Sequence, residues 1–157
     1  MENVIGDVVK ADGTVGARWG RAFVIINGKR KEVAELQKIN GKLDFKKAEV
    51  KSAGTLWVQH KITGVEGTGS ATWFFNTSEL TKKELAAIKS GKQFIIDQLE
   101  VSNDDPASDA GSQVVTFEHI LLNSKIIGQY DGSSDEVLTE DADFTFDGSD
   151  VLKEFNQ

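Results

Sequence analysis

The apolar residues of this chain occur in short stretches, several of which alternate one for one with polar residues. A period of two is the pattern of a half-buried β-strand, because successive side chains point to opposite faces of a sheet. The clearest example lies near the C-terminus, where Ala142, Phe144 and Phe146 alternate with acidic and hydroxyl side chains. Fifteen glycines against one proline add many sites for tight turns. The sequence therefore predicts a mainly β fold, an antiparallel β-sandwich or barrel.

Turn residues divide these stretches into strands. Asn27-Gly28 and Asn40-Gly41 are typical of two-residue hairpin turns, since both residue types tolerate the positive φ that such turns need. After each dipeptide an apolar or alternating stretch resumes. On this basis strands are predicted at 22–27, 30–36, 43–51, 68–76, 93–101, 114–122, 125–130 and 137–147.

One short helix is predicted among the strands, at about 81–90. Thr81 and Glu84 have the spacing of a capping box, in which each side chain satisfies a free backbone amide of the first turn. Gly91 follows, and glycine just past the last turn is a common helix stop. A helix this short is unstable in isolation, so it is expected to pack on the flank of the sheet.

The length of 157 residues fits a single domain, 1–157, with an N-terminal arm at 1–17. A second irregular segment is predicted at 52–67, as a long loop between strands. It holds three glycines and the apolar triplet Leu56-Trp57-Val58. An exposed apolar cluster is unfavourable in water, so Trp57 either folds back on the core or is covered by a partner.

Charge is distributed unevenly along the chain, whose net charge is −7. Residues 1–96 hold 16 of the 18 basic residues, and residues 97–157 hold 15 of the 25 acidic ones. One interpretation is a solvated acidic half that favours solubility. The other is a molecule whose copies pack head to tail, positive surface on negative surface. An acidic chain is also a poor candidate for electrostatic binding to nucleic acid or to an anionic membrane.

Several kinds of chemistry lack the residues that they need. The sequence contains no cysteine, which excludes disulfides, thiolate metal sites and a cysteine nucleophile. The glycine cluster 64–69 is not followed by the Gly-Lys-Ser/Thr or the helix of a phosphate-binding loop. His60 is expected at the surface or at an interface, and His119 in the core or half-buried. Without a nucleophile, a base and a group to orient it, we predict no enzyme, no cofactor and no metal site.

Signals of membrane insertion and of secretion are also missing from the sequence. No run approaches the roughly 20 apolar residues of a membrane helix. The N-terminus lacks the basic and apolar regions of a signal peptide. These patterns predict a cytoplasmic protein with no membrane anchor.

One segment resembles a known family. Residues 60–73, His-Lys-Ile-Thr-Gly-Val-Glu-Gly-Thr-Gly-Ser-Ala-Thr-Trp, are similar to the most distinctive stretch of the tail tube (core tail) proteins of Gram-positive contractile-tailed phages. The same family occurs in defective prophages and phage-like bacteriocins. Segments 16–28, 117–127 and 136–146 resemble the first strand and turn, the penultimate strand and the acidic last strand of these proteins, in the same order.

The resemblance implies an antiparallel β-sandwich or half-barrel subunit with one flanking helix. It also implies a structural virion protein whose copies form hexameric rings, stacked into a hollow tube inside a contractile sheath. Such a tube conducts DNA during ejection, or pierces the target in bacteriocins. Its partners are the sheath, the baseplate and the tail terminator. The implied location is the virion tail, assembled in the cytoplasm of the bacterial host.

The resemblance also implies site residues. The loop 52–67 corresponds to the contact between rings, with Leu56, Trp57, Val58, His60, Lys61, Gly64 and Gly67 as expected interface residues. The family often has basic residues after the glycine of this loop, whereas Thr55 and Leu56 follow Gly54 here, so the contact is expected to be more apolar. The expected acidic lining of the lumen is Asp141, Asp143 and Asp147, because DNA is itself negatively charged and slides past carboxylates.

The alternative function is a non-enzymatic β-sandwich binding module, or another tail or baseplate component. In a binding module, Trp19, Trp57 and Trp73 would serve as stacking platforms for a ligand. Trp73 alternates with Ala71 and Phe75, which favours a place in the core and argues against the module.

Overall fold

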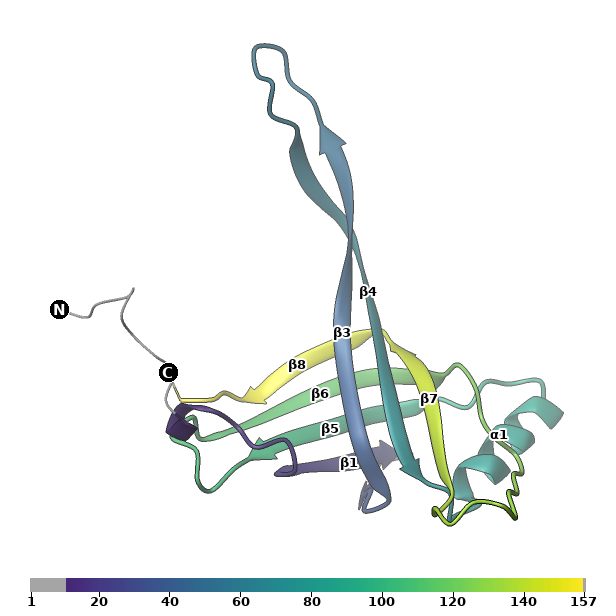
Figure 1. The fold of residues 1–157 in the computed structure, drawn as a ribbon. Helices are drawn as coiled ribbons and strands as arrows, with labels where there is room; N and C mark the ends of the chain where they lie inside the picture. The colour runs from purple at the N-terminus through teal and green to yellow at the C-terminus, as the bar shows by residue number, and fades with distance from the viewer. Residues whose placement is uncertain (1–10, 157) are drawn as a thin grey trace.

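The structure is a computed structural model that describes residues 11–156, so residues 1–10 of the predicted arm lie outside the described range. It is mostly antiparallel β-sheet with one helix, as the sequence predicts (Figure 1). The elements are a 3-10 turn at Ala11–Gly13, β1 (Gly20–Ile26), β2 (Lys29–Glu32), β3 (Leu36–Val50), β4 (Gln59–Phe74), α1 (Glu79–Lys89), β5 (Ile96–Asp104), β6 (Ser112–Leu122), β7 (Thr139–Phe146) and β8 (Gly148–Lys153).

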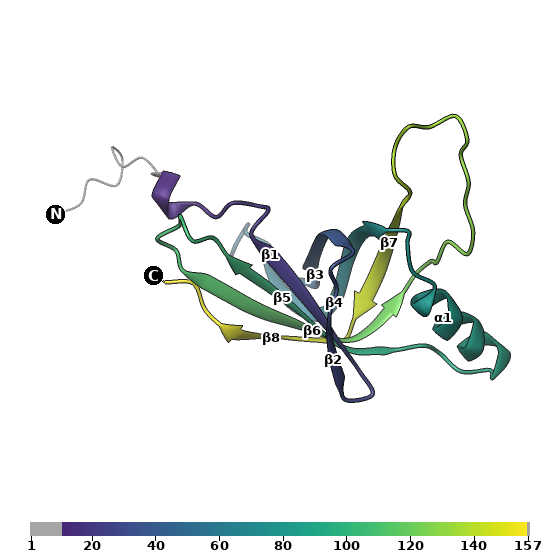
Figure 2. The same ribbon diagram turned by 90° about the horizontal axis from the view of Figure 1, so that it is seen from below.

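The strands form one sheet that folds over on itself. Its order is β2-β1-β5-β6-β7-β4-β3, and β8 pairs with β6. β6 belongs to both halves, because its first part pairs with β5 and β8 whereas Leu121 and Leu122 pair with β7. At the change of partner, His119 has a φ of 56° and no partner on β5. Beyond this point β3, β4 and β7 cross the strands of the other half (Figures 1 and 2).

The hydrophobic core lies between the two halves of the sheet. The rings of Phe117, Phe144 and Phe146 form a cluster with centroids 4.8–6.2 Å apart. Trp73 is buried among the core residues, as predicted, and this burial removes it as a stacking platform for a ligand. The other buried apolar residues are Ala22, Ala71, Ile96, Leu99, Ile120 and Ala142.

The helix α1 covers one end of the body, beside the connection from β6 to β7 (Figure 2). It begins at Glu79, before the predicted start, so the predicted capping box at Thr81 is wrong. The hydroxyl of Thr77 accepts the Glu79 amide hydrogen instead, at 3.4 Å. The predicted stop is confirmed, since Gly91 has a φ of 72° and its amide donates to a carbonyl of the last turn.

A cleft of about 460 Å³ remains between β1–β2 and β3–β4, next to α1. Leu80 of α1 lines this cleft and packs against the core. At its rim, Lys31 Nζ lies 3.0 Å from Glu79 Oε2 and ties β2 to the start of the helix. The hydrogen bond and the charge of Lys31 lower the pKa of Glu79.

The two Asn-Gly dipeptides occupy different structures. Asn27 and Gly28 have φ values of 52° and 80° and close the β1–β2 hairpin, as predicted. Asn40 and Gly41 lie inside β3 and pair with β4, so the predicted second turn is wrong. The ring of Phe117 packs on Gly41, where a Cβ would lie 2.5 Å from the ring carbon Cε1. Gly41 therefore serves the close packing of a ring on a strand rather than a turn.

Three other expectations differ from the structure. The predicted loop 52–67 is mostly strand, because β4 begins at Gln59 and its glycines stay extended in the hairpin. Segment 125–130 belongs to the connection between β6 and β7, and side-chain contacts rather than strand pairing hold it. The strand β8 was not predicted, since its Gly-Ser-Asp start resembles a turn.

Candidate functional site

β3 and β4 form a long hairpin whose far half projects from the body (Figure 1). Only its base is covered by a second layer, where the rings of Phe144 and Phe146 lie against Gly69 and Gly67. From Asn40 to Val50 every residue of β3 is exposed. The same strand pair therefore belongs to the core at one end and stands in solvent at the other.

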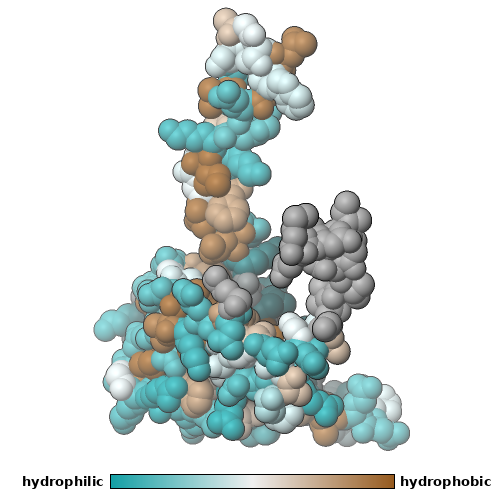
Figure 3. Space-filling view, turned by 90° about the vertical axis from the view of Figure 1, so that its left-hand side faces the viewer, coloured by the Kyte–Doolittle hydropathy of each residue, from teal (hydrophilic) through white to brown (hydrophobic). Residues whose placement is uncertain are grey.

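The projecting part, which we call the stalk (residues 43–50 and 59–66), carries an apolar surface without a cover. Leu43, Phe45, Ile62 and Val65 are each about half exposed. Leu43 and Phe45 have the same parity as Ile39, which packs against the core, so they extend the core-facing side of the sheet into solvent. Figure 3 shows these apolar patches along the stalk. A row of this kind is unusual on a monomer surface and indicates a binding partner.

The tip of the hairpin (residues 51–58) is the most exposed apolar segment of the described chain. Leu56 is 102% exposed and Trp57 is 83% exposed, with Val58 beside them. The turn is closed by Gly54, with a φ of 90°, and by a hydrogen bond from the Trp57 amide to the Thr55 hydroxyl at 3.1 Å. Trp57 therefore does not fold back on the core.

The other predicted interface residues lie on β4 and differ from one another. His60 and Lys61 are exposed and pair with β3 just below the tip. Gly64 lies beside the stem of Lys46. Gly67 is buried, and a Cβ there would lie 2.5 Å from the ring of Phe146, so packing inside the subunit accounts for this glycine. The structure contains no second copy, so a contact by the remaining residues stays a prediction.

Asp141 and Asp143 lie on one face of β7, and Asp147 directly follows the strand with the same parity. We call these three predicted acidic residues the aspartate row (Asp141, Asp143 and Asp147). All three side chains are exposed, whereas the alternate residues Ala142 and Phe144 point into the core. The row lies on the outer side of the β3–β4–β7 half of the sheet. The three residues are exposed and have the same parity, and their place in a lumen stays a prediction.

The same face carries a second row, which the sequence reasoning missed. This lysine row (Lys38, Lys42 and Lys46) lies on β3, at the edge of the sheet. The register pairs Lys38 with Thr72 of β4, and Thr72 with Asp141 of β7. A signal was present, because these lysines have the opposite parity to Leu43 along the strand. The outer face is therefore striped, with lysines on one strand and aspartates two strands away.

Hydroxyl groups of β4 lie between the two rows. Thr72 donates to Asp141 Oδ1 at 2.6 Å, and Ser70 donates to Asn40 Oδ1 at 3.2 Å. Further along, Thr68 donates to an oxygen of Asp44 at 3.0 Å. These bonds fix the side chains of the face against one another and make it polar across its whole width.

His119 lies outside the core, and its ring is half exposed, which agrees with the half-buried alternative of the prediction. Its Nε2 lies 3.5 Å from Asp147 Oδ2. The positive φ of 56° at His119 interrupts the strand alternation, so alternation with Phe117 does not bring the ring into the core.

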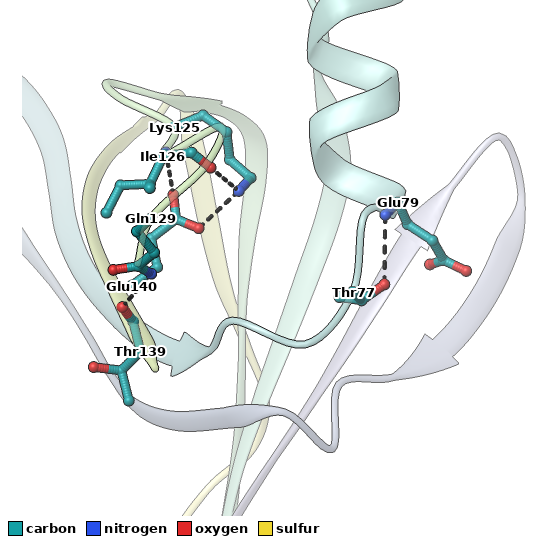
Figure 4. Close-up of polar contacts among 7 residues, drawn as sticks. All are labelled: Thr77, Glu79, Lys125, Ile126, Gln129, Thr139 and Glu140. Atoms are coloured by element: carbon teal, nitrogen blue, oxygen red, sulfur yellow. Dashed lines mark hydrogen bonds and ion pairs between the residues drawn. The ribbon is translucent and has the colours of Figure 1, made fainter. Parts of the chain in front are cut away.

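A buried ion pair holds the connection between β6 and β7 (Figure 4). Lys125 Nζ lies 2.7 Å from Glu140 Oε2, and both side chains are almost fully enclosed. The other carboxylate oxygen accepts the Ile126 amide hydrogen at 2.6 Å. Sequence reasoning missed this pair, although Glu140 has the parity of the core residues Ala142 and Phe144, where a charge requires a partner.

The described residues offer little for ligand chemistry. Within residues 11–156, no group of three or more histidine, aspartate or glutamate side chains is placed to hold a metal ion. Over the same range, no helix has both the length and the apolar character needed to cross a membrane. The features that stand out are therefore surfaces: the tip, the stalk and the striped face.

Comparison with known proteins agrees with the resemblance in the sequence. A family model described as phage tail tube protein matches residues 7–153. The chain is 32% identical to the phage-like element PBSX protein XkdM of Bacillus subtilis (strain 168), over 143 residues that cover 91% of this chain and 93% of that protein.

Two solved structures share the fold. A chain in the cryo-EM structure of the anti-feeding prophage tube-terminating cap has a TM-score of 0.69 at 12% identity, covering 96% of this chain and 99% of that one. A chain in the extended sheath–tube complex of the PVC extracellular contractile injection system has a TM-score of 0.66 at 9% identity, covering 90% and 93%. At such identities the likeness concerns the fold alone.

Proposed function

The chain belongs to the phage tail tube family, and from this premise we propose that its copies close into hexameric rings, which stack into the tube of a contractile phage tail or phage-like particle. Membership makes the chain a structural component of a tail tube and not an enzyme. The number of copies in a ring and the passage of DNA are parts of the proposal.

The observation that carries the stacking is the projecting hairpin. Its tip exposes Leu56 and Trp57 almost completely, and its stalk leaves an apolar side uncovered. Tryptophan is enriched at interface hot spots, and an apolar surface of this kind favours a contact that removes it from water. The tip lies at the opposite end of β3 from the cleft and the body (Figure 1). A contact from the tip of one copy to the body of another is therefore head-to-tail. The same contact can add ring after ring along the tube without closing on itself.

The striped face is the proposed lining of the bore. It carries the aspartate row together with Asp44 and Glu66, against the three lysines of the lysine row. Acidic groups thus exceed basic ones, and a net negative wall repels the phosphates of DNA. The lysines and hydroxyls make this wall less uniformly acidic than the sequence suggested. DNA passing through would find no continuous basic track to hold it.

The proposed partners follow from the same role. The tube contacts the sheath along its outer surface, and the baseplate and tail terminator at its two ends. Support comes from the particles that contain chains of this fold, which include a tube-terminating cap and a sheath–tube complex. We place assembly in the cytoplasm of the bacterial host, before release of the particle.

The test is negative-stain electron microscopy of the purified protein over a concentration series, with light scattering for mass. The expected result is a population of rings or tubes of uniform diameter and sixfold end views above a threshold concentration. If only monomers form, the cognate baseplate is added as a nucleus. A chain that stays monomeric even then contradicts the proposal and returns the binding module as the better function.

A further inference from the structure

We propose that the lysine row of one copy lies against the aspartate row of its neighbour in the ring, so that ion pairs close the seam between adjacent subunits. The partner is thus a second copy of this chain, placed side by side. This inference rests on the proposed ring and goes beyond it by naming the two surfaces that meet. It is carried by three observations on the outer face: a free strand edge, opposite charges at the two sides, and an exposed aspartate row, of which only Asp147 has a basic neighbour, His119.

The lysine row lies on a strand with one free side. β3 is the last strand of its half of the sheet and pairs only with β4 in the described structure. An edge strand of this length offers unpaired backbone groups, and natural proteins cover such an edge or protect it with charge. Lys38 and Lys46 make no ion pair with any described residue, and Lys42 lies 3.9 Å from Asp44. The row is therefore available to a carboxylate from outside the chain.

The aspartate row lies near the opposite side of the same three strands. Beyond β7, the sheet continues through Leu121 and Leu122 of β6, and two further backbone hydrogen bonds join Asn123 to Asp143 and Asp147 to Glu118. One oxygen of Asp141 accepts a hydrogen bond from Thr72, and its other oxygen has no hydrogen-bond partner in the part of the chain described. A neighbouring copy on the β7 side of these three strands thus meets carboxylates, whereas a copy on the β3 side meets lysines.

The buried ion pair keeps the aspartate row clear. The Asn123 amide donates to the Asp143 carbonyl, and beyond this residue the chain leaves the plane of the sheet. It does so because the Glu140 carboxylate binds the Lys125 ammonium and the Ile126 amide. Glu140 points to the core side, opposite to the aspartates. The connection between β6 and β7 is therefore bound on the core side of β7, through Glu140 (Figure 4), and the aspartate side chains remain exposed.

Ring symmetry brings the two rows to the same level. β3 and β7 are each antiparallel to β4, so they run in the same direction. The register puts Lys38 level with Asp141, and Lys42 level with Thr145, between Asp143 and Asp147. The copies of a ring are related by rotation about its axis, which does not change the position of a residue along that axis. With the strands parallel to the axis, the lysines of one copy therefore lie level with the carboxylates of its neighbour. Within one chain the rows are two strands apart, roughly 10 Å, which leaves the contact to a neighbour.

Charge reversal tests the seam. One variant carries Lys38→Glu and Lys42→Glu, and the other carries Asp141→Lys and Asp143→Lys. Each alone places like charges at every seam, which we expect to raise the concentration needed for assembly roughly tenfold or more. An equimolar mixture is expected to assemble as the wild type does, because copies that alternate around a ring of even number have opposite charges at every seam. The fourfold variant is expected to assemble for the same reason.

The control matched to the lysine variant is Lys89→Glu with Lys92→Glu, which makes the same change of net charge on exposed residues at the end of α1. It should leave the assembly concentration unchanged, and circular dichroism should show all variants folded. Assembly of either reversed variant at the wild-type concentration overturns the seam. Failure of both the mixture and the fourfold variant to restore assembly overturns it as well. A wild type that forms no rings contradicts the proposed function instead.

Cysteine cross-linking decides the seam independently of ring stability. The chain has no cysteine, so Lys38→Cys with Asp141→Cys introduces the only thiols. Their separation within one chain exceeds the reach of a disulfide. Under mild oxidation we expect a ladder of cross-linked species that ends at six copies. The pair Lys89→Cys with Asp141→Cys is the control. A yield no higher than that of the control overturns the proposal.

Discussion

The body and the stalk share the same two strands, but the apolar surface of these strands is buried in the body and exposed in the stalk. In the body, β3 and β4 place glycines under aromatic rings, as at Gly41 beneath Phe117 and Gly69 beneath Phe144. In the stalk, the same side of the hairpin carries side chains such as Phe45 and no ring lies over them; Phe45 is 51% exposed. The same face of this strand pair thus covers the core of the subunit at its base and is exposed to solvent in the stalk.

The difference shows where the burial of each region comes from. The body removes its apolar surface from water within one chain, so its packing determines the stability of the monomer. The stalk and tip gain burial only when a partner covers them. Substitutions in the body should therefore change the free energy of unfolding, whereas substitutions in the hairpin beyond Leu43 should change association and leave the monomer almost unaffected.

The largest effect is expected at the buried ion pair of the body. Glu140→Ala leaves Lys125 charged and enclosed without a partner, which costs about 3–5 kcal/mol of unfolding free energy. Urea denaturation of the monomer measures this loss. The matched change in the hairpin, Glu49→Ala, should have almost no effect, because Glu49 is exposed. The double variant Lys125→Met with Glu140→Leu should recover much of the stability; a double variant as unstable as Glu140→Ala would contradict the charge argument.

A pair of glycines sharpens the comparison further. In Gly69→Ala the new methyl group overlaps the ring of Phe144 and lies 2.5 Å from the Asn40 carbonyl oxygen, so we expect a loss of about 1–3 kcal/mol. In Gly64→Ala, on the stalk, the methyl group lies 3.6 Å from the Lys46 stem, which is an ordinary contact. This variant should be neutral. Thermal unfolding of both gives the difference, and equal losses would show that the stalk is packed like the body.

Sequence patterns predicted the body better than the hairpin. The alternation around Phe144 and the turn at Asn27-Gly28 are local signals, and both agree with the structure. The glycines of β4 were interpreted as breaks in a loop, because the rings that pack on them come from distant strands and leave no local trace. The positive φ of His119 is equally hard to predict, since it occurs where β6 changes partners.

The candidate site was predicted only in part. The apolar tip is a local feature of Leu56 and Trp57, and its exposure agrees with the sequence argument for a surface that needs cover. The lysine row was missed because its three residues lie four apart on β3, in the basic half of the chain, and only their parity opposite to Leu43 indicates a shared face. The Lys125–Glu140 pair joins residues of a loop and a strand, and Glu140 alone carried a signal, through its parity among core residues.

The tip tests the other half of the comparison. Leu56→Ala with Trp57→Ala should change the unfolding free energy of the monomer by no more than about 0.5 kcal/mol, because both side chains are already in solvent. Assembly, followed by light scattering, should weaken. In the body, Phe144→Ala should cost about 3–5 kcal/mol, since that ring is 1% exposed. A large fall of the melting temperature in the tip variant would instead place Trp57 in the core of the monomer.

The smallest effect is expected at Glu84 on α1. Partial burial raises the pKa of this carboxyl, and the charge of Lys125 offsets part of the increase. A native pKa above the unfolded one means that the ionised carboxylate costs stability at neutral pH. This cost disappears as the pH falls through the native pKa to below the unfolded value of about 4.3. Glu84→Gln should therefore raise Tm slightly at neutral pH and lose this advantage in acid. Melting curves across that pH range measure the change, with Glu49→Gln of the hairpin as the matched control; an equal gain there would erase the distinction between body and stalk.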